Sequence, residues 1–179
     1  MTTMKIEAVF DENIGRVWEA VTSLSTSEWR SDLSSIEVSD DQKSFIEYTK
    51  QGYPTKFTIT EFDSPQFYAF TMENDNISGK WTGEFQKLAA RKTKIIFTED
   101  VIAKKFYMKP FIKSYLEKQQ QTYIRDLAAY LAKNLTLKNQ KSKRDCVSEK
   151  FQKFFLKCDI CPNGSSDKAI EYRYRRCLL

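Results

Sequence analysis

The sequence predicts an α+β fold in which one curved antiparallel sheet of about seven strands surrounds a long C-terminal helix, with two short helices after the first strand. Apolar and polar residues alternate with a period of two in six successive segments after residue 32, which is typical of strands. A helical period precedes these segments, and a long glycine-free helical stripe follows them. Elements in this order form a layered α+β architecture.

The first 32 residues predict one strand and two short helices. Residues 4–11 alternate as a strand, and residues 11–24 then take a helical period with Asn13 or Asp11 as the N-cap. Residues 25–32 have the pattern of a second short helix that begins at a serine or threonine cap.

Six strand candidates follow in a row. They are residues 33–40, 43–50, 54–63, 66–74, 77–88 and 93–103. Short polar or Gly/Pro turns separate them, and consecutive strands joined by short turns pair antiparallel.

The last predicted element is a helix over residues 107–135. Its apolar residues recur on one face, with one polar turn at residues 119–121, and Pro110 is tolerated near the first turn. We expect this helix to pack on the sheet. A sheet that curls around a helix can leave a gap between the two.

Composition excludes several function classes. The chain of 179 residues has no histidine, which removes the usual general base near neutral pH, the usual zinc ligand and the Ser–His and Cys–His nucleophile pairs. No apolar run approaches the roughly 18 residues of a transmembrane helix, and the N-terminus lacks a signal-peptide pattern. We therefore expect a cytoplasmic protein without a transmembrane segment, and we assign no catalytic residue, cofactor or metal to it.

Charge divides the chain into two parts. The net charge is +5, yet residues 1–135 hold 18 Lys+Arg and 19 Asp+Glu and sum to −1, whereas residues 136–179 hold 11 and 5 and sum to +6. The composition therefore predicts a folded domain over residues 1–135 and a basic, cysteine-containing extension over residues 136–179.

The extension contains all four cysteines. Cys158 and Cys161 are spaced C-x-x-C, and Cys146 and Cys177 could complete four zinc ligands, although the 11 and 15 intervening residues match no standard zinc pattern. Its lysines and arginines interleave with aromatic residues, which permits a nucleic-acid or acidic-membrane surface. The favoured interpretation is a solvated extension, and no nucleic-acid partner is expected for the domain itself.

The strand at residues 77–88 predicts a cavity. Its two glycines alternate with large side chains, so that one face carries Ile77, Gly79, Trp81, Gly83 and Phe85 and the other carries Ser78, Lys80, Thr82 and Glu84. Glycine weakens a strand, so its use here indicates that the two glycines leave free space under the helix. The alternative is that they only allow the sheet to bend around a filled core.

The strand at residues 93–103 has two possible inward faces. The preferred one carries Phe97 and Glu99 together with Ile95 and Val101, and the other carries Ile96, Thr98, Asp100 and Ile102. A carboxyl among aromatic rings has a raised pKa, so Glu99 could act as an acid or hold a polar ligand group. The favoured alternative places Glu99 in solvent at the end of the sheet, because carboxylates are rarely buried.

These elements resemble the START/polyketide-cyclase-like (SRPBCC) superfamily, the helix-grip fold, over about residues 3–135. The resemblance rests on the element order, on the early helix pair at residues 11–32, on the aromatic and G-x-W pattern of residues 68–85, and on residues 93–100. Members typically hold an apolar ligand between sheet and helix; some are lipid carriers and a few are cyclases. No motif of a particular enzyme subfamily is present in the sequence.

The leading functional hypothesis is a non-catalytic carrier or sensor that binds a small hydrophobic or lipid-like molecule between sheet and helix. The predicted ligand-binding residues are Trp29, Phe57, Ile59, Phe70, Met72, Gly79, Trp81, Phe85, Phe97, Glu99, Tyr115 and Tyr123. One alternative is a cyclase- or hydratase-like enzyme in the same cavity, and another is a protein-interaction domain with a filled core. The sequence indicates no oligomeric state.

Overall fold

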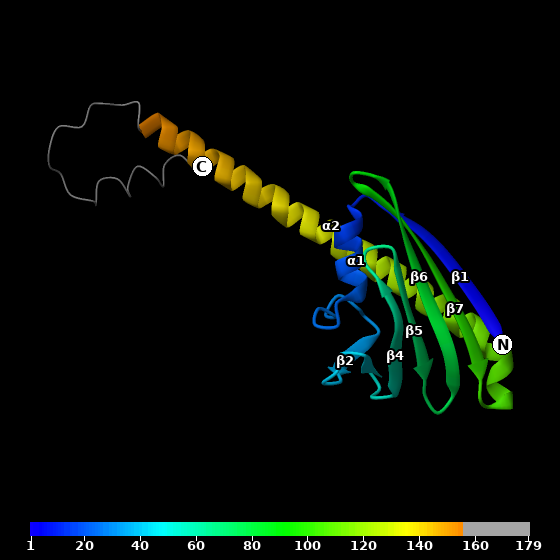
Figure 1. Cartoon of the computed structure of the whole chain (residues 1–179). Coiled ribbons are helices and arrows are strands. Elements are labelled where there is room, and N and C mark those ends of the chain that lie inside the picture. The colour runs from blue at the N-terminus through cyan, green and yellow to red at the C-terminus, as the bar shows by residue number, and fades with distance from the viewer. Residues whose placement is uncertain (156–179) are drawn as a thin grey trace. The chain divides into compact units, whose positions relative to one another are not determined.

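A computed structural model describes residues 1–155 of the chain, and the side chains of residues 1–133. Its sheet has seven strands, all antiparallel, in the order β1-β7-β6-β5-β4-β3-β2 (Figure 1). The elements are β1 (Thr2–Phe10), α1 (Ile14–Thr22), β2 (Leu33–Val38), β3 (Ser44–Thr49), β4 (Pro54–Asp63), β5 (Phe67–Glu73), β6 (Ile77–Ala89), β7 (Lys92–Ala103), the 3₁₀ turn η1 (Phe106–Met108) and α2 (Lys109–Phe155). The α+β fold class and all seven predicted strands are confirmed.

The predicted strand faces are also confirmed. Within β7, Ile95, Phe97, Glu99 and Val101 are buried, which is the preferred inward set. The register pairs Trp81 of β6 with Glu99 and Gly83 with Phe97, so the inward residues of the two strands lie side by side.

The first helix begins where the capping pattern predicts. The Asn13 side chain accepts a hydrogen bond from the backbone N–H of Arg16 at 3.0 Å, which satisfies one free donor of the first turn of α1. Val17 and Trp18 are buried on its inner face. The helix therefore follows from a local cap and an apolar face that packs on the sheet.

The prediction of a second short helix at residues 25–32 is wrong. The segment forms turns, with the N–H of Arg30 bonded to the carbonyl of Ser27 at 2.9 Å. The N–H of Ser31 donates instead to the carboxylate of Asp126 on α2 at 2.8 Å. An eight-residue helix is marginal by itself, and here tertiary hydrogen bonds and the inward turn of Arg30 hold the segment in another shape. We call residues 23–32 the α1–β2 loop.

The long helix α2 packs across the inner face of the sheet (Figure 1). Leu116 and Leu127 are fully buried and Ile112 and Leu131 nearly so, in agreement with the predicted stripe. The helix continues past residue 135 to Phe155. Within the part of the chain that the structure describes, no helix is both long and apolar enough to cross a membrane.

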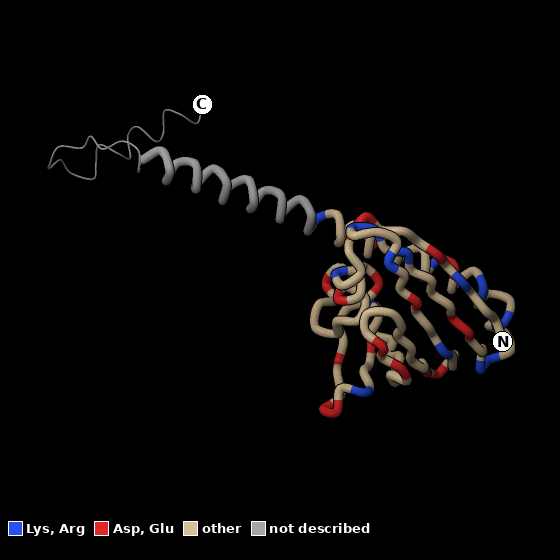
Figure 2. The backbone as a smooth tube through the Cα atoms, turned by 45° about the horizontal axis from the view of Figure 1, so that its top comes forward, with Lys and Arg blue, Asp and Glu red and all other residues tan. Residues whose placement is uncertain are grey.

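Residues Met1–Leu135 form one compact unit. Lysine, arginine, aspartate and glutamate are interspersed over its strands (Figure 2). The cysteine hypotheses fall on Cys146, Cys158, Cys161 and Cys177, whose side chains lie outside the described residues. A separate role for residues 136–179 stays a prediction.

Two clusters of buried residues make up the core. The first joins α1 and α2 to the sheet through Val17, Trp18, Phe85 and Leu127, among others. The second joins β3, β4, β5, β6 and β7 to the first turns of α2 through residues such as Phe45 and Leu116. Ile59, Phe70 and Trp81 contact both clusters. The core is thus continuous along the sheet, and a space remains between it, the α1–β2 loop and α2.

Candidate ligand-binding cavity

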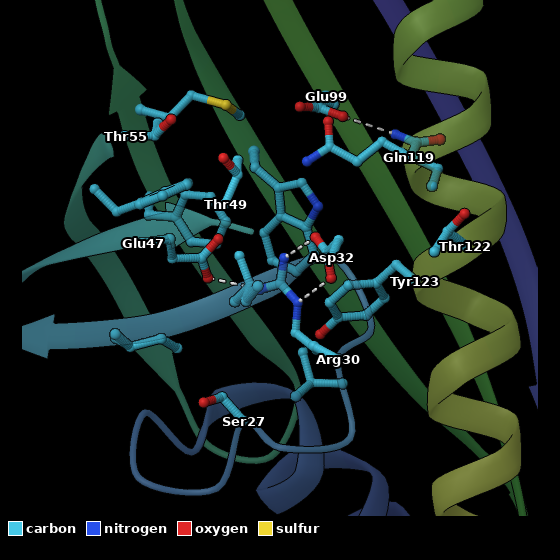
Figure 3. A pocket seen from close by; sticks show the side chains of 18 of the residues that line it. Ser27, Arg30, Asp32, Glu47, Thr49, Thr55, Glu99, Gln119, Thr122 and Tyr123 are labelled. Carbon is cyan, nitrogen blue, oxygen red and sulfur yellow. Dashed lines mark hydrogen bonds and ion pairs between the residues drawn. The ribbon is translucent and has the colours of Figure 1, made fainter. Parts of the chain in front are cut away.

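The space between sheet, loop and helix is a cavity of about 530 Å³. Its wall comes from the inner faces of β3 to β7, the α1–β2 loop and one face of α2 (Figure 3). A volume of this size is in the range of small-molecule sites in proteins, which is roughly 300–1,000 Å³. A concave space of ligand size therefore lies beside the packed core, and it opens to solvent at its rim.

Aromatic side chains of the sheet form the apolar wall. The rings of Phe45 and Phe57 stack with centroids 4.9 Å apart, and those of Phe70 and Trp81 stack at 4.8 Å. Phe57 also meets Phe70 edge-on at 5.2 Å. These contacts hold the rings rigidly in place, because aromatic pairs prefer such stacked and edge-on geometries. The wall offers an apolar surface that loses little entropy when a ligand binds.

The two glycines of β6 do not leave the free space that the sequence suggested. A Cβ at Gly83 would collide with the indole ring of Trp81, which lies across that position, and would come within 3.2 Å of Phe97. A Cβ at Gly79 would lie 2.5 Å from the carbonyl oxygen of Asp100 on β7. Gly83 therefore makes room for Trp81, and Gly79 permits a close approach of β7. Neither glycine lines the cavity.

A partly buried ionic cluster lies at the loop side of the cavity. Arg30 donates from Nη1 to Glu47 Oε1 at 2.6 Å and makes two bonds to Asp32, from Nη2 at 2.7 Å and from Nε at 3.2 Å (Figure 3). Its guanidinium carbon also lies 5.1 Å from the ring centroid of Tyr123. We call Arg30, Asp32 and Glu47 the arginine cluster.

Burial and pairing act in opposite directions on the arginine cluster. Burial lowers the pKa of Arg30, but Glu47 and Asp32 outweigh that effect and the net pKa is raised, so the guanidinium stays charged. Burial raises the pKa of Glu47, and Arg30 offsets part of the rise. Both carboxyls share the one guanidinium of Arg30, so each has an ionic partner although one cation faces two acids.

Trp29 and Tyr123 connect the loop to α2 beside this cluster. The Trp29 ring meets Tyr123 edge-on at 5.2 Å and stacks on Tyr130 at 5.8 Å. Burial raises the pKa of Tyr123, so its hydroxyl keeps its proton. These rings fasten the α1–β2 loop over one side of the cavity.

Glu99 lies apart from the arginine cluster, next to α2 (Figure 3). Its side chain is buried, with 6% of the residue exposed, and lines the cavity. Gln120 Nε2 donates to Glu99 Oε2 at 3.1 Å, and this is the one hydrogen bond of the carboxyl within the described residues. Burial raises the pKa of Glu99 to about 7, and the Gln120 bond opposes the rise. The alternative that placed Glu99 in solvent is wrong, because the inward face of β7 continues to Val101.

Nine of the twelve predicted ligand-binding residues line this one cavity. They are Trp29, Phe57, Phe70, Met72, Trp81, Phe97, Glu99, Tyr115 and Tyr123. Tyr115 is 55% exposed and lies at the rim. Gly79 is packed against β7, Phe85 packs against Trp18 at 5.0 Å, and Ile59 belongs to the core clusters, so these three lie outside the lining. Ligand contact by the nine stays a prediction.

Sequence reasoning missed the polar residues of the cavity. Glu47 shares the inner face of β3 with Phe45, and Gln120 lies one helical turn after Leu116 on the buried stripe of α2. Each is a polar residue at a position where the period predicts an apolar one, and that break was the available signal. Arg30 and Asp32 gave no such signal, because they lie in a loop that has no period.

The arrangement can bind a molecule that has both apolar and polar parts. The stacked rings accept an apolar body, and Glu99 faces it with a carboxyl that titrates near neutral pH. The structure carries no cluster of histidine or cysteine there, since the chain has no histidine and its cysteines follow residue 145. Among the described residues the polar chemistry of the cavity rests on carboxyl, guanidinium, ammonium, amide and hydroxyl groups.

Comparison with solved structures shows proteins of the same fold at low sequence identity. A START superfamily protein from Mycobacterium smegmatis superposes with a TM-score of 0.65 at 9% identity, over 73% of this chain and 97% of its own. A conserved protein from Geobacillus kaustophilus superposes with a TM-score of 0.65 at 10% identity, over 74% of this chain and 96% of its own. The Zhui aromatase/cyclase from Streptomyces sp. R1128 superposes with a TM-score of 0.64 at 11% identity, over 75% of this chain and 95% of its own.

No protein-family model matches the sequence, and a search of curated proteins finds no match either. At these identities the solved structures establish the fold alone. Nearly the whole of each similar chain is matched. The chain therefore has the START-like (SRPBCC) helix-grip fold, as the resemblance of its sequence predicted.

Proposed function

We propose that the domain binds one small amphipathic molecule in the cavity and acts as a non-catalytic carrier or sensor. The observation that carries the proposal is the unfilled space of about 530 Å³ between the sheet and α2. Concave and largely apolar spaces of this size are where proteins bind small molecules, and rigid aromatic side chains form one wall of this one.

The polar groups of the lining refine the ligand expected from sequence. A purely hydrophobic ligand would leave Glu99 and the arginine cluster facing apolar atoms, which is unfavourable for groups that water would otherwise solvate. An amphipathic molecule satisfies both sides of the cavity, since its apolar body meets the rings and its polar end meets Glu99. The cavity is consequently described better by an amphipathic ligand than by a wholly apolar one.

The test combines occupancy with a blocked cavity. Native mass spectrometry of the protein purified from cells should show a mass excess that is lost on denaturation. The uncharged dye N-phenyl-1-naphthylamine, which fluoresces in apolar surroundings, should bind to the emptied protein. Gln119→Trp places an indole in the lining of α2, whereas Gln121→Trp places it on the exposed face two residues later.

We expect Gln119→Trp to weaken dye binding by at least about tenfold and Gln121→Trp to leave it unchanged. Thermal unfolding verifies that both variants are folded. A co-purified compound indicates a carrier, and dye binding by a protein without cargo indicates a sensor of lower affinity. Equal dye binding by both variants, or neither cargo nor dye binding in the unmodified protein, would refute the proposal.

A second candidate is an enzyme that uses Glu99 as an acid or base. The observation that favours it is a carboxyl with a pKa of about 7 at the cavity wall, because efficient proton transfer requires a pKa near the working pH. The Zhui aromatase/cyclase, one of the similar structures, is an enzyme with this fold. A compound recovered from the protein would then be released with a changed mass, and Glu99→Gln would bind it unchanged. Release of the unaltered compound by the unmodified protein would exclude this candidate.

A further inference from the structure

Among the ionisable groups that line the cavity, more carboxyls than cationic groups are shielded from solvent. Three carboxyls and three cationic groups contribute to the described lining: Asp32, Glu47 and Glu99 against Arg30, Lys50 and Lys118. Both lysines are exposed, so solvent screens their charges. Arg30 is therefore the one cation of the described lining that is shielded from solvent, against three carboxyls.

Arg30 makes no bond to Glu99 among the described residues. Three of its donors are engaged by Asp32 and Glu47 at 2.6 to 3.2 Å, and the arginine cluster lies away from Glu99 in the cavity (Figure 3). The salt bridges of the described residues include none to Glu99. Glu99 is thus a buried carboxyl at the cavity wall that the protein does not neutralise.

The local hydrogen bonding of Glu99 suits its ionised form. Gln120 donates its amide N–H to Oε2, and a donated hydrogen bond stabilises a carboxylate. Oε1 receives no bond within the described residues and is not fully closed off, since the closed-off polar atoms without a partner are those of Trp29 and Tyr68. One oxygen is held as an acceptor and the other is open to a molecule in the cavity.

A cation supplied by the ligand would complete this site. Burial of a carboxylate without a partner is unfavourable, which is the cause of its raised pKa. A protonated amine placed at Oε1 would form a charge-assisted hydrogen bond in surroundings where such bonds are strong. The apolar rings of Phe70, Trp81 and Phe97 would surround the rest of the molecule.

We propose that the ligand of this cavity is an amphipathic amine, whose ammonium group pairs with Glu99 and whose apolar body lies against the aromatic wall. This inference rests on the proposed function and adds the chemical class of the ligand. The competing arrangement is a protonated Glu99 that donates its proton to a neutral oxygen acceptor, such as a carbonyl. The two arrangements differ in charge, and so they differ in their response to Glu99→Gln and in the direction of proton exchange.

The experiment uses two probes of the same size. 1-Naphthylmethylamine carries an ammonium group and 1-naphthalenemethanol a neutral hydroxyl, and each has one apolar ring system. Isothermal titration calorimetry measures both at pH 8 and low salt. The unmodified protein should bind the amine at least about tenfold more tightly than the alcohol, as expected for one charge-assisted bond in a buried site.

Glu99→Gln keeps the shape and the hydrogen-bonding capacity of the side chain but removes its charge. This variant should lose the preference for the amine and bind the alcohol within about twofold of the unmodified protein. Glu84→Gln is the matched control, because Glu84 is exposed on the outer face of β6 and outside the cavity lining. It should retain the full preference, which separates a local pairing from a change in net charge.

Proton exchange supplies an independent readout of the same step. At pH 7 about half of Glu99 is protonated, so binding of an ammonium should release about half a proton, whereas binding of a neutral acceptor should take protons up. The groups that face Glu99 are Gln120 and Tyr115 from α2 and the paired residues Trp81 and Met4 from β6 and β1. None of these titrates near pH 7, because burial and the Glu99 charge raise the pKa of Tyr115 above its ordinary value.

The outcomes separate this inference from the proposed function. Amine preference and proton release that both disappear in Glu99→Gln would support the amine. Binding of the alcohol as tightly as the amine, a preference that persists in Glu99→Gln, or proton uptake would overturn the amine while leaving a ligand-binding cavity. Absence of binding by both probes in a protein that still binds N-phenyl-1-naphthylamine would overturn the amine alone. Absence of dye binding and of co-purified cargo as well would overturn the cavity proposal and this inference with it.

Discussion

Two groups of ionisable side chains lie in the same cavity wall and differ in how their charge is balanced. In the arginine cluster, Arg30 is bonded to both Asp32 and Glu47. Glu99 has a single neutral partner, the amide of Gln120. The first group is complete within the protein, so its role is to hold the α1–β2 loop to β3. The second group is incomplete within the protein, which makes Glu99 the point where a ligand can contribute.

The largest expected effect comes from breaking the complete group. Arg30→Met should lower the free energy of unfolding by about 3–5 kcal/mol, because it leaves Glu47 buried without its cation. Chemical denaturation at pH 7 measures the change. A loss below about 1 kcal/mol would mean that the cluster is hydrated and contributes no more than a surface pair.

Removing the charge of Glu99 should raise the free energy of unfolding, whereas Arg30→Met should lower it. Burial raises the pKa of Glu99 to about 7 from an ordinary 4.5, so the folded state holds a proton that the unfolded state has lost between these values. The unmodified protein therefore loses stability as pH rises from 4.5 through 7, by about 3 kcal/mol in total.

Glu99→Gln does not titrate and escapes this loss. It should match the unmodified protein near pH 4 and exceed it by about 3 kcal/mol at pH 8.5. Denaturation curves for both proteins across this range measure the difference. A difference that does not change with pH would show that Glu99 has an ordinary pKa.

A smaller effect is expected from the amide partner of Glu99. Gln120→Leu removes the one described donor to the carboxylate and should lower stability at pH 8.5 by about 1–2 kcal/mol, with little change at pH 4. In a Glu99→Gln background the same substitution should lose its dependence on pH. If the effect of Gln120→Leu still depended on pH in the Glu99→Gln background, a group other than Glu99 would be the cause.

The smallest effect is expected at an exposed pair. Lys104 bonds to Glu73 at 2.7 Å, yet the Glu73 side chain is 69% exposed. Lys104→Met should change stability by about 0–1 kcal/mol and should lose that effect at high salt. It is the matched control for Arg30→Met, since both remove one cation from a carboxylate. An effect as large as that of Arg30→Met would remove burial as the reason for the contrast.

Most of the fold was predictable from sequence because its signals are local. The alternation of β6 and β7 placed Trp81, Phe97 and Glu99 on the inner face, and Asn13 marked the start of α1. The helix predicted at residues 25–32 failed because its pattern was local whereas its hydrogen bonds are not. Ser31 donates to Asp126, 95 residues later in the chain.

The glycines of β6 also separate what the sequence predicts from what only the structure shows. Their position on the inner face followed from the period of two, but what lies over them did not. The indole of Trp81 covers Gly83 and the backbone of β7 approaches Gly79, so the free volume is elsewhere, beside the α1–β2 loop. Side-chain direction follows from strand period, whereas the filling of a volume depends on neighbours from several elements.

Strand faces, turns and the apolar stripe of α2 depend on residues that are neighbours in sequence, so the hydrophobic period and local propensity suffice to predict them. The balance of charge in the cavity is not of this kind. Arg30 meets Glu47 across 17 residues, and Gln120 meets Glu99 across 21. Whether a buried carboxyl acquires a cation depends on which distant segments fold against it. For this reason only the assembled structure distinguishes Glu47, which has a cationic partner, from Glu99, which has none among the described residues.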